Sequence, residues 1–434
     1  MSKIKTIFLI LCGLGAVILG WNLYLTYFES EPPSIILTPT SKFISPNTKL
    51  SLALEDKKQG LKHVSVYLIQ NNQSIALLDK DLNQQKSLTI SFELPKSKIK
   101  PGILTLEIKV WDSSWKNFGQ GNLTLLTKKL TYDPMPPRFS ILSKAHYLNQ
   151  GGSGLIVFTL NEKVKKAGIK LDNYFFPAYY NPSQNKYYCI FAWPYSLSPD
   201  HEPLLIAEDL AGNVAQTTFY YHVNPKKFPH ENINISDSFL KRKMPYFKQY
   251  FPHETNLLTL FLKVNRTLRK QNRQQLKKLG QDTSNIPLFS GVFKRLPNSA
   301  QKASFGEIRD YFYHGQKIDR QTHLGLDLAS IARAKVPAAN KGRVIFAGQM
   351  GIYGNVVIID HGLGLQTLYA HLSEIKVTPG EIVQKGQTIG RTGSTGLAGG
   401  DHLHFAVLVS GLPVNPIEWL DKHWLQNNIY DRLY

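Results

Sequence analysis

Five polar residues in the last third of the chain are of the types that bind and activate a metal ion. His323 and Asp327 lie in the segment QTHLGLDLAS, His371 lies in LYAHLS, and His402 and His404 lie in GGDHLHFAV. Two imidazoles and a carboxylate, as in His323, Asp327 and His404, are the ligand set of a catalytic zinc ion that keeps a fourth position for water. His371 and His402 can then move a proton or stabilise developing charge. If the five side chains converge, they predict a metal-dependent hydrolase. If they do not, the chain is a membrane-tethered binding protein.

The spacing of these residues sets a condition on the backbone. HLHF alternates as a strand does, so His402 and His404 point to the same face, with Cα atoms ~7 Å apart. The four residues from His323 to Asp327 would span ~13 Å in a straight strand, too far for two ligands of one ion. The chain must therefore bend, with Gly325 the expected place, or His323 must lean in from a preceding loop. No HExxH motif occurs, which excludes the common helical zinc-protease site.

Short strand patterns surround these residues from about Ser304 to Asp421. They are separated by glycine turns and read GRVIFAG, NVVIIDHG, QTLYAHL, EIVQKGQTIG and HLHFAVLV. This pattern predicts one antiparallel β domain, to which we assign residues 289–434. The glycine-rich loop from Gly393 to Gly400 would let the backbone of a substrate approach closely.

An imperfect repeat precedes this domain. Pro32-Pro33 and Pro136-Pro137 each open a block of alternating strand patterns, about the length of a β-sandwich domain of ~100 residues. Asp209 to Asn213 resembles the late D-x-A-G-N turn of bacterial immunoglobulin-like repeats. We therefore expect two tandem Ig-like β-sandwiches, over residues 31–133 and 134–224, with spacing as their simplest role. The fold class is thus mainly β.

Helical signals dominate residues 225–288, which we expect to form a helical linker that packs over, and can gate, the domain that follows. Ser236 or Asp237 can cap a short helix over DSFLKRKMPYF. A longer helix is expected from near Thr255 to Gly280. It has one apolar face and a roughly opposite basic face, formed by Lys263, Arg266, Lys270, Arg273 and Lys277. A solvated face is the preferred interpretation, and contact with anionic headgroups or wall polymer is the alternative.

The N-terminal segment predicts the cellular compartment in which the rest of the chain lies. Residues 6–28 are uncharged and long enough to span a ~30 Å hydrocarbon core as a helix. Lys3 and Lys5 before it and Glu29 and Glu31 after it favour a cytoplasmic N-terminus. Residues 1–30 are therefore expected to form a single-pass anchor in the lipid bilayer of the cytoplasmic (inner) membrane, with the catalytic domain extracytoplasmic or periplasmic. A cleaved signal peptide is the alternative.

The net charge limits the classes of partner that we expect, and the cysteine content shows how the domains are stabilised. The formal charge of +20 implies an anionic partner, such as nucleic acid, phospholipid headgroups or an acidic cell-wall polymer. No recognised nucleic-acid-binding motif occurs, so nucleic acid is not expected. The chain has only two cysteines, Cys12 in the apolar segment and Cys189, so its domains depend on their cores and not on disulfides.

The C-terminal domain resembles the M23 family of zinc metallopeptidases, of the lysostaphin and LytM type. The resemblance rests on H-x-x-x-D at His323 and Asp327, YGN at 353–355 with IDHG after it, YAHL around His371, GSTG around Ser394, and the closing HLHF. FGEIRDY, which contains Arg309, resembles the opening segment of the family. The resemblance covers roughly residues 305–421.

The resemblance implies one Zn²⁺ per chain on His323, Asp327 and His404, with His371 and His402 assisting catalysis. It also implies hydrolysis of the stem-peptide cross-links of peptidoglycan, with cell-wall enzymes or divisome-type proteins as further candidate partners. Some relatives have lost zinc ligands and instead bind and activate wall amidases. A non-catalytic or latent regulator of that kind is the alternative function, although no ligand is lost here.

Overall fold

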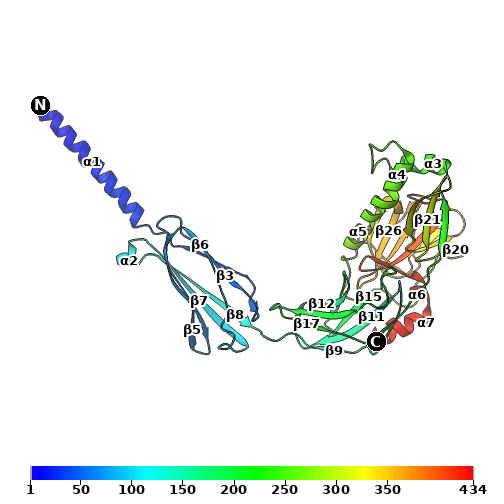
Figure 1. Ribbon diagram of the computed structural model, residues 1–434, viewed down its shortest axis with the longest axis horizontal. Coiled ribbons are helices and arrows are strands. Elements are labelled where there is room, and N and C mark those ends of the chain that lie inside the picture. Colours follow the sequence, from blue (N-terminus) through cyan, green and yellow to red (C-terminus); the bar gives the residue numbers. More distant parts are fainter. Residues whose placement is uncertain (1, 434) are drawn as a thin grey trace. The chain divides into compact units, whose positions relative to one another are not determined.

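The computed structural model describes residues 2–433, so the outermost residues of the first and last predicted segments, Met1 and Tyr434, lie outside it (Figure 1). The protein is mainly β, which confirms the predicted class. The chain divides into two compact units. One comprises Met1–Pro137 with Glu208–Val214, and the other comprises Arg138–Ala207 with Ala215–Tyr434.

Helix α1 (Ser2–Tyr27) begins the first unit. Its stretch Ile4–Tyr27 is 24 residues long with a mean hydropathy of 2.1, long and apolar enough to cross a membrane. From Ile4 to Tyr27 its side chains are exposed, and Tyr27 at its end packs against the ring of Trp115.

Two sheets enclose the hydrophobic core of the first unit. Their interior residues alternate with exposed ones along the strands, as in Leu50, Leu52 and Leu54 on one sheet and Leu104, Leu106 and Ile108 on the other. The three-stranded sheet has the order β1-β3-β6, and the five-stranded sheet has the order β2-β8-β7-β4-β5. The elements are β1 (Ser34–Thr38), β2 (Phe43–Ile44), β3 (Leu50–Glu55), β4 (Leu61–Gln70), β5 (Gln73–Gln85), β6 (Ser87–Phe92), β7 (Gly102–Asp112), the short α2 (Lys116–Gly119) and β8 (Leu123–Tyr132). That they form an immunoglobulin-like domain stays a prediction.

A second set of short strands follows, in sheets of order β14-β15-β11-β9, β13-β12-β16-β17 and β10-β18. They are β9 (Phe139–Ile141), β10 (His146–Asn149), β11 (Ser153–Leu160), β12 (Val164–Leu171), β13 (Tyr174–Pro177), β14 (Tyr179–Asn181), β15 (Lys186–Ala192), β16 (Leu204–Asp209), β17 (Val214–Thr217) and β18 (Tyr221–Asn224). Leu155 and Phe191 of these strands share one core with Leu403 and Trp419 of the C-terminal domain. The second predicted sandwich and the last domain are therefore packed together, and not separated by an open linker.

The linker contains a strand that the sequence analysis did not predict. β19 (His230–Asn234) pairs in parallel with β21 of the C-terminal domain. The helices follow: α3 (Asp237–Phe247), α4 (Leu257–Lys263), the π-helical turn η1 (Val264–Leu268) and α5 (Arg269–Leu279). Ser236 caps α3 by accepting the Phe239 N–H, as predicted.

An antiparallel sheet with the order β20-β23-β31-β27-β26-β25-β29, and with β32 beside β31, forms the centre of the C-terminal domain. Its strands are β20 (Ala300–Ala303), β23 (Leu326–Ala329), β25 (Gly342–Gln349), β26 (Asn355–Asp360), β27 (Leu365–Ala370), β29 (Ile382–Val383), β31 (Leu403–Val409) and β32 (Leu412–Val414). β21 (Ile308–Tyr313) and β22 (Gln316–Thr322) join β19 in one smaller sheet, and β24 (Lys335–Pro337), β28 (Glu374–Ile375) and β30 (Thr388–Arg391) form another. The helical elements are η2 (Gly351–Tyr353), α6 (Pro416–Leu420), α7 (Lys422–Leu425), η3 (Gln426–Tyr430) and α8 (Asp431–Leu433).

The order of the central sheet brings together residues that are far apart in the sequence. β31 lies between β23 and β27, so His404 faces Asp327 on one neighbouring strand and Ala370 on the other. His371 follows directly after Ala370. The pairing of these strands is therefore what assembles the candidate site.

Candidate metal centre

His323, Asp327 and His404 converge on one point. The Nε2 atom of His323 lies 2.9 Å from Oδ1 of Asp327 and 3.0 Å from Nδ1 of His404, and that Nδ1 lies 3.0 Å from the same oxygen. Ligands of a tetrahedral ion with bonds of ~2.0–2.1 Å lie about 3.3 Å apart. The three donor atoms therefore fit a single small metal ion with little adjustment.

The backbone bends between His323 and Asp327, as the spacing of these two residues requires if they bind one ion. β22 ends at Thr322, His323 lies in the connection, and the chain bends at Gly325 before β23 begins at Leu326. A Cβ atom on Gly325 would lie 2.6 Å from Cε1 of His404 and 2.8 Å from the Phe405 carbonyl oxygen. Only glycine leaves room for the His404 ring at this bend.

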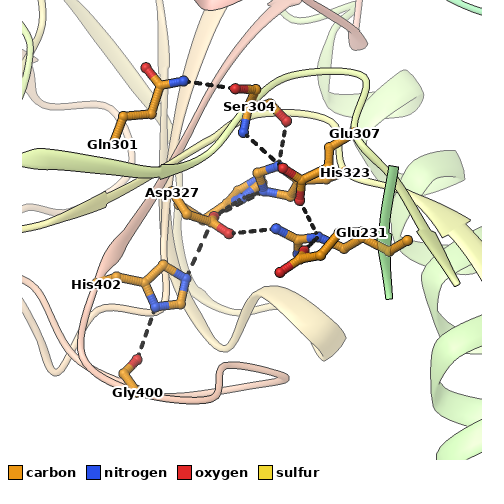
Figure 2. Close-up of polar contacts among 10 residues, drawn as sticks. Glu231, Gln301, Ser304, Glu307, His323, Asp327, Gly400 and His402 are labelled. Atoms are coloured by element: carbon orange, nitrogen blue, oxygen red, sulfur yellow. Dashed lines mark hydrogen bonds and ion pairs between the residues drawn. The ribbon is translucent and has the colours of Figure 1, made fainter. Parts of the chain in front are cut away.

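Backbone carbonyls fix which nitrogen of each histidine is available. His323 Nδ1 lies 2.9 Å from the Ser304 carbonyl oxygen, so this nitrogen donates and the Nε2 lone pair points at the cluster. Nδ1 of His371 donates in the same way to Thr395, and Nδ1 of His402 donates to Gly400 (Figure 2 shows the bond of His402). In each of these rings Nε2 is therefore the nitrogen that can take a metal or a proton.

His371 and His402 lie beside the cluster. Their ring centroids are 4.9 Å apart, and the His371 ring is 5.9 Å from that of His404. The Nε2 atom of His402 lies 3.5 Å from Oδ1 of Asp327. The structure thus brings all five predicted residues to one place.

The charges of the site depend on burial and on one carboxylate. Burial opposes ionisation of Asp327, but His323 and hydrogen bonds from the histidines hold its pKa well below the usual value. Burial lowers the pKa of His404 to about 4 and that of His371 well below its ordinary value. Burial also acts against protonation of His402, yet the bond to Asp327 raises its pKa overall. Asp327 is therefore ionised, and His404 and His371 are neutral, which are the forms in which a carboxylate and an imidazole bind metal.

Arg309 holds the outer oxygen of Asp327. Its Nη2 atom donates to Oδ2 of Asp327 at 3.1 Å, and its Nε atom lies 2.8 Å from Glu307 and 3.3 Å from Glu231 (Figure 2). Oδ1 of Asp327 is thereby directed to the histidines. The motif that contains Arg309 was recognised in the sequence. Glu231 was missed, because its contact depends on the unpredicted strand β19.

A cavity of about 420 Å³ opens beside the cluster. Its walls come from the linker as well as from the C-terminal domain, and include Ser236, Phe239, Arg242, Phe261, Arg269, Tyr311 and Tyr353 together with all five predicted site residues. A peptide bound in this cavity would therefore contact β19, α3, α4 and α5 of the linker as well as the C-terminal domain.

Residues 321–416 form a peptidase family M23 domain, which confirms the resemblance of the sequence to that family. The DD-carboxypeptidase/endopeptidase Mpg of Neisseria meningitidis serogroup B is 44% identical over 95 residues, and the peptidoglycan DD-endopeptidase ShyA of Vibrio cholerae serotype O1 is 40% identical over 96 residues. Each match covers 22% of this chain and 22% of the relative, so the chain spans about a fifth of the length of these curated relatives. Among solved structures, the catalytic domain of lysostaphin from Staphylococcus simulans is 28% identical with a TM-score of 0.25, over 29% of this chain and 94% of that one.

Proposed function

We propose that the protein is a zinc-dependent endopeptidase that hydrolyses the stem-peptide cross-links of peptidoglycan. The observation that carries the proposal is the convergence of His323, Asp327 and His404 within an M23 domain, at the spacing of ligands around one ion. The names of the relatives, which are peptidoglycan or DD-endopeptidases, support the substrate class.

Each residue of the site has a distinct task in this proposal. Zinc, when bound, supplies a water whose pKa is about 7 and a Lewis acid for the peptide carbonyl. Backbone carbonyls accept from Nδ1 of His371 and His402, so their Nε2 atoms are the ones that can act beside the ligands: one can accept a proton and the other can donate to the developing oxyanion. Arg309 binds the outer oxygen of Asp327 and so positions this ligand.

The remaining parts of the chain fit a wall enzyme tethered to a membrane. We propose that α1 anchors the protein in the cytoplasmic membrane and that the rest is periplasmic, with residues 31–133 and 134–224 acting as Ig-like spacers. The apolar length of α1 and the net charge of +20 support this arrangement. A basic surface would favour approach to an anionic wall.

Digestion of defined peptidoglycan tests the proposal. The zinc-loaded full chain, in detergent, is incubated with purified sacculi of known cross-link chemistry, and the soluble products are identified by mass spectrometry. We expect loss of cross-linked muropeptides with the wild type and with His423→Ala, at an exposed histidine of α7 that does not line the cavity, but not with His404→Ala. Intact cross-links with wild type and His404→Ala alike would reject the proposal.

A further inference from the structure

Arg269, the first residue of α5, is a cavity-lining arginine without an acidic partner. Its Nε atom donates to the backbone oxygen of Asn265 at 3.1 Å, and its Nη2 atom donates to the Asn265 side-chain oxygen at 2.6 Å. Both acceptors are neutral. Within residues 2–433, no carboxylate forms an ion pair with Arg269, and its Nη1 atom has no hydrogen-bond partner.

Arg309, the other arginine beside the candidate metal ligands, differs from Arg269 because its charge is paired. Arg309 also lines the cavity, but it is surrounded by Glu231, Glu307 and Asp327, within 3.3 Å of each. Its charge is therefore satisfied inside the protein. The charge of Arg269 is not, although the two side chains face the same cavity.

A half-buried cation without a counter-ion is costly, because desolvation weakens its interaction with water and the two acceptors on Asn265 that replace it carry no charge. Burial lowers the pKa of Arg269, and Arg273 and Arg309 act in the same direction, while Tyr311 and Tyr353 act against it. An anion that enters the cavity would remove this cost. Arg242, an exposed residue of α3 that also lines the cavity, adds a second positive charge.

We infer that Arg269 binds a free carboxylate of the peptide substrate while the scissile bond lies at the His323–Asp327–His404 cluster. The inference rests on the proposed function, because stem peptides carry carboxylates outside the bond that is cleaved. The guanidinium Nη1 group would donate a charge-assisted hydrogen bond to that carboxylate. Tyr311 and Tyr353, which line the cavity, would flank the bound chain. Arg269 is thus a specificity-determining residue supplied by the linker, and the peptidase domain without the linker would lack it.

Kinetics with two matched substrates test the inference. One is a synthetic cross-linked stem-peptide dimer with free carboxylates, and the other is the same dimer with those carboxylates converted to carboxamides. The zinc-loaded full chain is compared with Arg269→Gln, Arg269→Lys and the control Lys270→Gln. Lys270 is the next residue of α5, is exposed and lies outside the cavity lining.

We expect Arg269→Gln to raise KM for the free-acid dimer by roughly 10- to 100-fold, the loss of one hydrogen bond between charged groups, with little change in kcat. On the amidated dimer, wild type and Arg269→Gln should have equal KM values. Arg269→Lys should fall between them on the free-acid dimer, because lysine keeps the charge without the planar fork. Lys270→Gln should match the wild type on both substrates.

Equal effects of Arg269→Gln on both dimers would show a structural role and would overturn the inference, as would no effect on either. If Arg269→Gln does not fold, judged by its circular dichroism, the same comparison is made with Arg269→Lys. If the wild type cleaves neither dimer, the proposed function fails. The subsite is then tested separately by calorimetric titration of the two dimers into the same protein, where equal affinities would overturn it.

Discussion

Replacing Gly325 by alanine should weaken zinc binding by displacing His404. The added Cβ atom would lie 2.6 Å from Cε1 and 2.7 Å from Nε2 of His404, and 2.8 Å from the Phe405 carbonyl oxygen. The Gly325 backbone does not occupy the left-handed region, so alanine adds no conformational strain there. The substitution therefore acts through the collisions of the new Cβ atom with the His404 ring and with the Phe405 carbonyl oxygen.

The size of the effect follows from these distances. Ordinary contact of a Cβ atom begins at 3.4 Å, so the His404 ring must move by about 0.8 Å, the difference between 3.4 and 2.6 Å. Metal–ligand distances tolerate only about ±0.2 Å. A displaced ligand should weaken zinc binding by at least the ~10- to 100-fold that loss of a supporting contact costs.

Zinc affinity is measured by competition with a chromogenic chelator, on the full chain in detergent. Gly399→Ala is the matched control, because it makes the same chemical change on the cavity wall with nothing within 4 Å of the new Cβ. Thermal unfolding shows whether both variants keep the fold. A Gly325→Ala protein that binds zinc as tightly as Gly399→Ala would refute the steric argument and the ligand role of His404.

Two further predictions concern stability and pH. Burial lowers the pKa of His361 to about 4, below the usual 6.5, so the unfolded state binds more protons between these values and stability is lost as pH falls through this window. The shift in pKa corresponds to about 3 kcal/mol of unfolding free energy. When unfolding is measured at pH 7.5 and at pH 4.5, His361→Gln should lose less stability on acidification than the wild type. Equal losses in the two proteins would contradict this prediction. Glu29 has a buried oxygen without a hydrogen-bond partner, which lies 3.8 Å from Nζ of Lys58 and beside two other buried carboxylates. Glu29→Gln supplies a donor there and should stabilise the first unit at pH 7 by about 1–3 kcal/mol, and a lower melting temperature than wild type would count against this account.

The sequence predicted the metal cluster because its residues stand in short, ordered motifs whose types are dictated by chemistry. It also predicted the bend at Gly325, because a straight strand cannot bring His323 and Asp327 to one ion. Ser236 as a helix cap was predictable for the same reason, since capping depends on a few neighbouring residues.

The contacts that surround the cluster could not be predicted in this way. Strand β19 has no strong alternation of its own and exists because it pairs with β21, more than 70 residues later. Its Glu231 reaches Arg309 only through that pairing. Arg269 likewise falls in the cavity because α5 packs against the peptidase domain, and its position on the helix alone did not distinguish it from the solvated basic residues nearby.

The central claim is that peptidase activity depends on one zinc ion per chain. The most direct test measures activity and bound zinc in the same samples. The metal-free full chain is titrated with zinc, bound metal is determined by mass spectrometry, and cleavage of cross-linked muropeptides is followed. The account predicts that cleavage is absent without metal, rises in proportion to bound zinc and reaches its maximum at one ion per chain. Cleavage that persists in the metal-free protein, or intact muropeptides when one zinc is bound per chain, would contradict it.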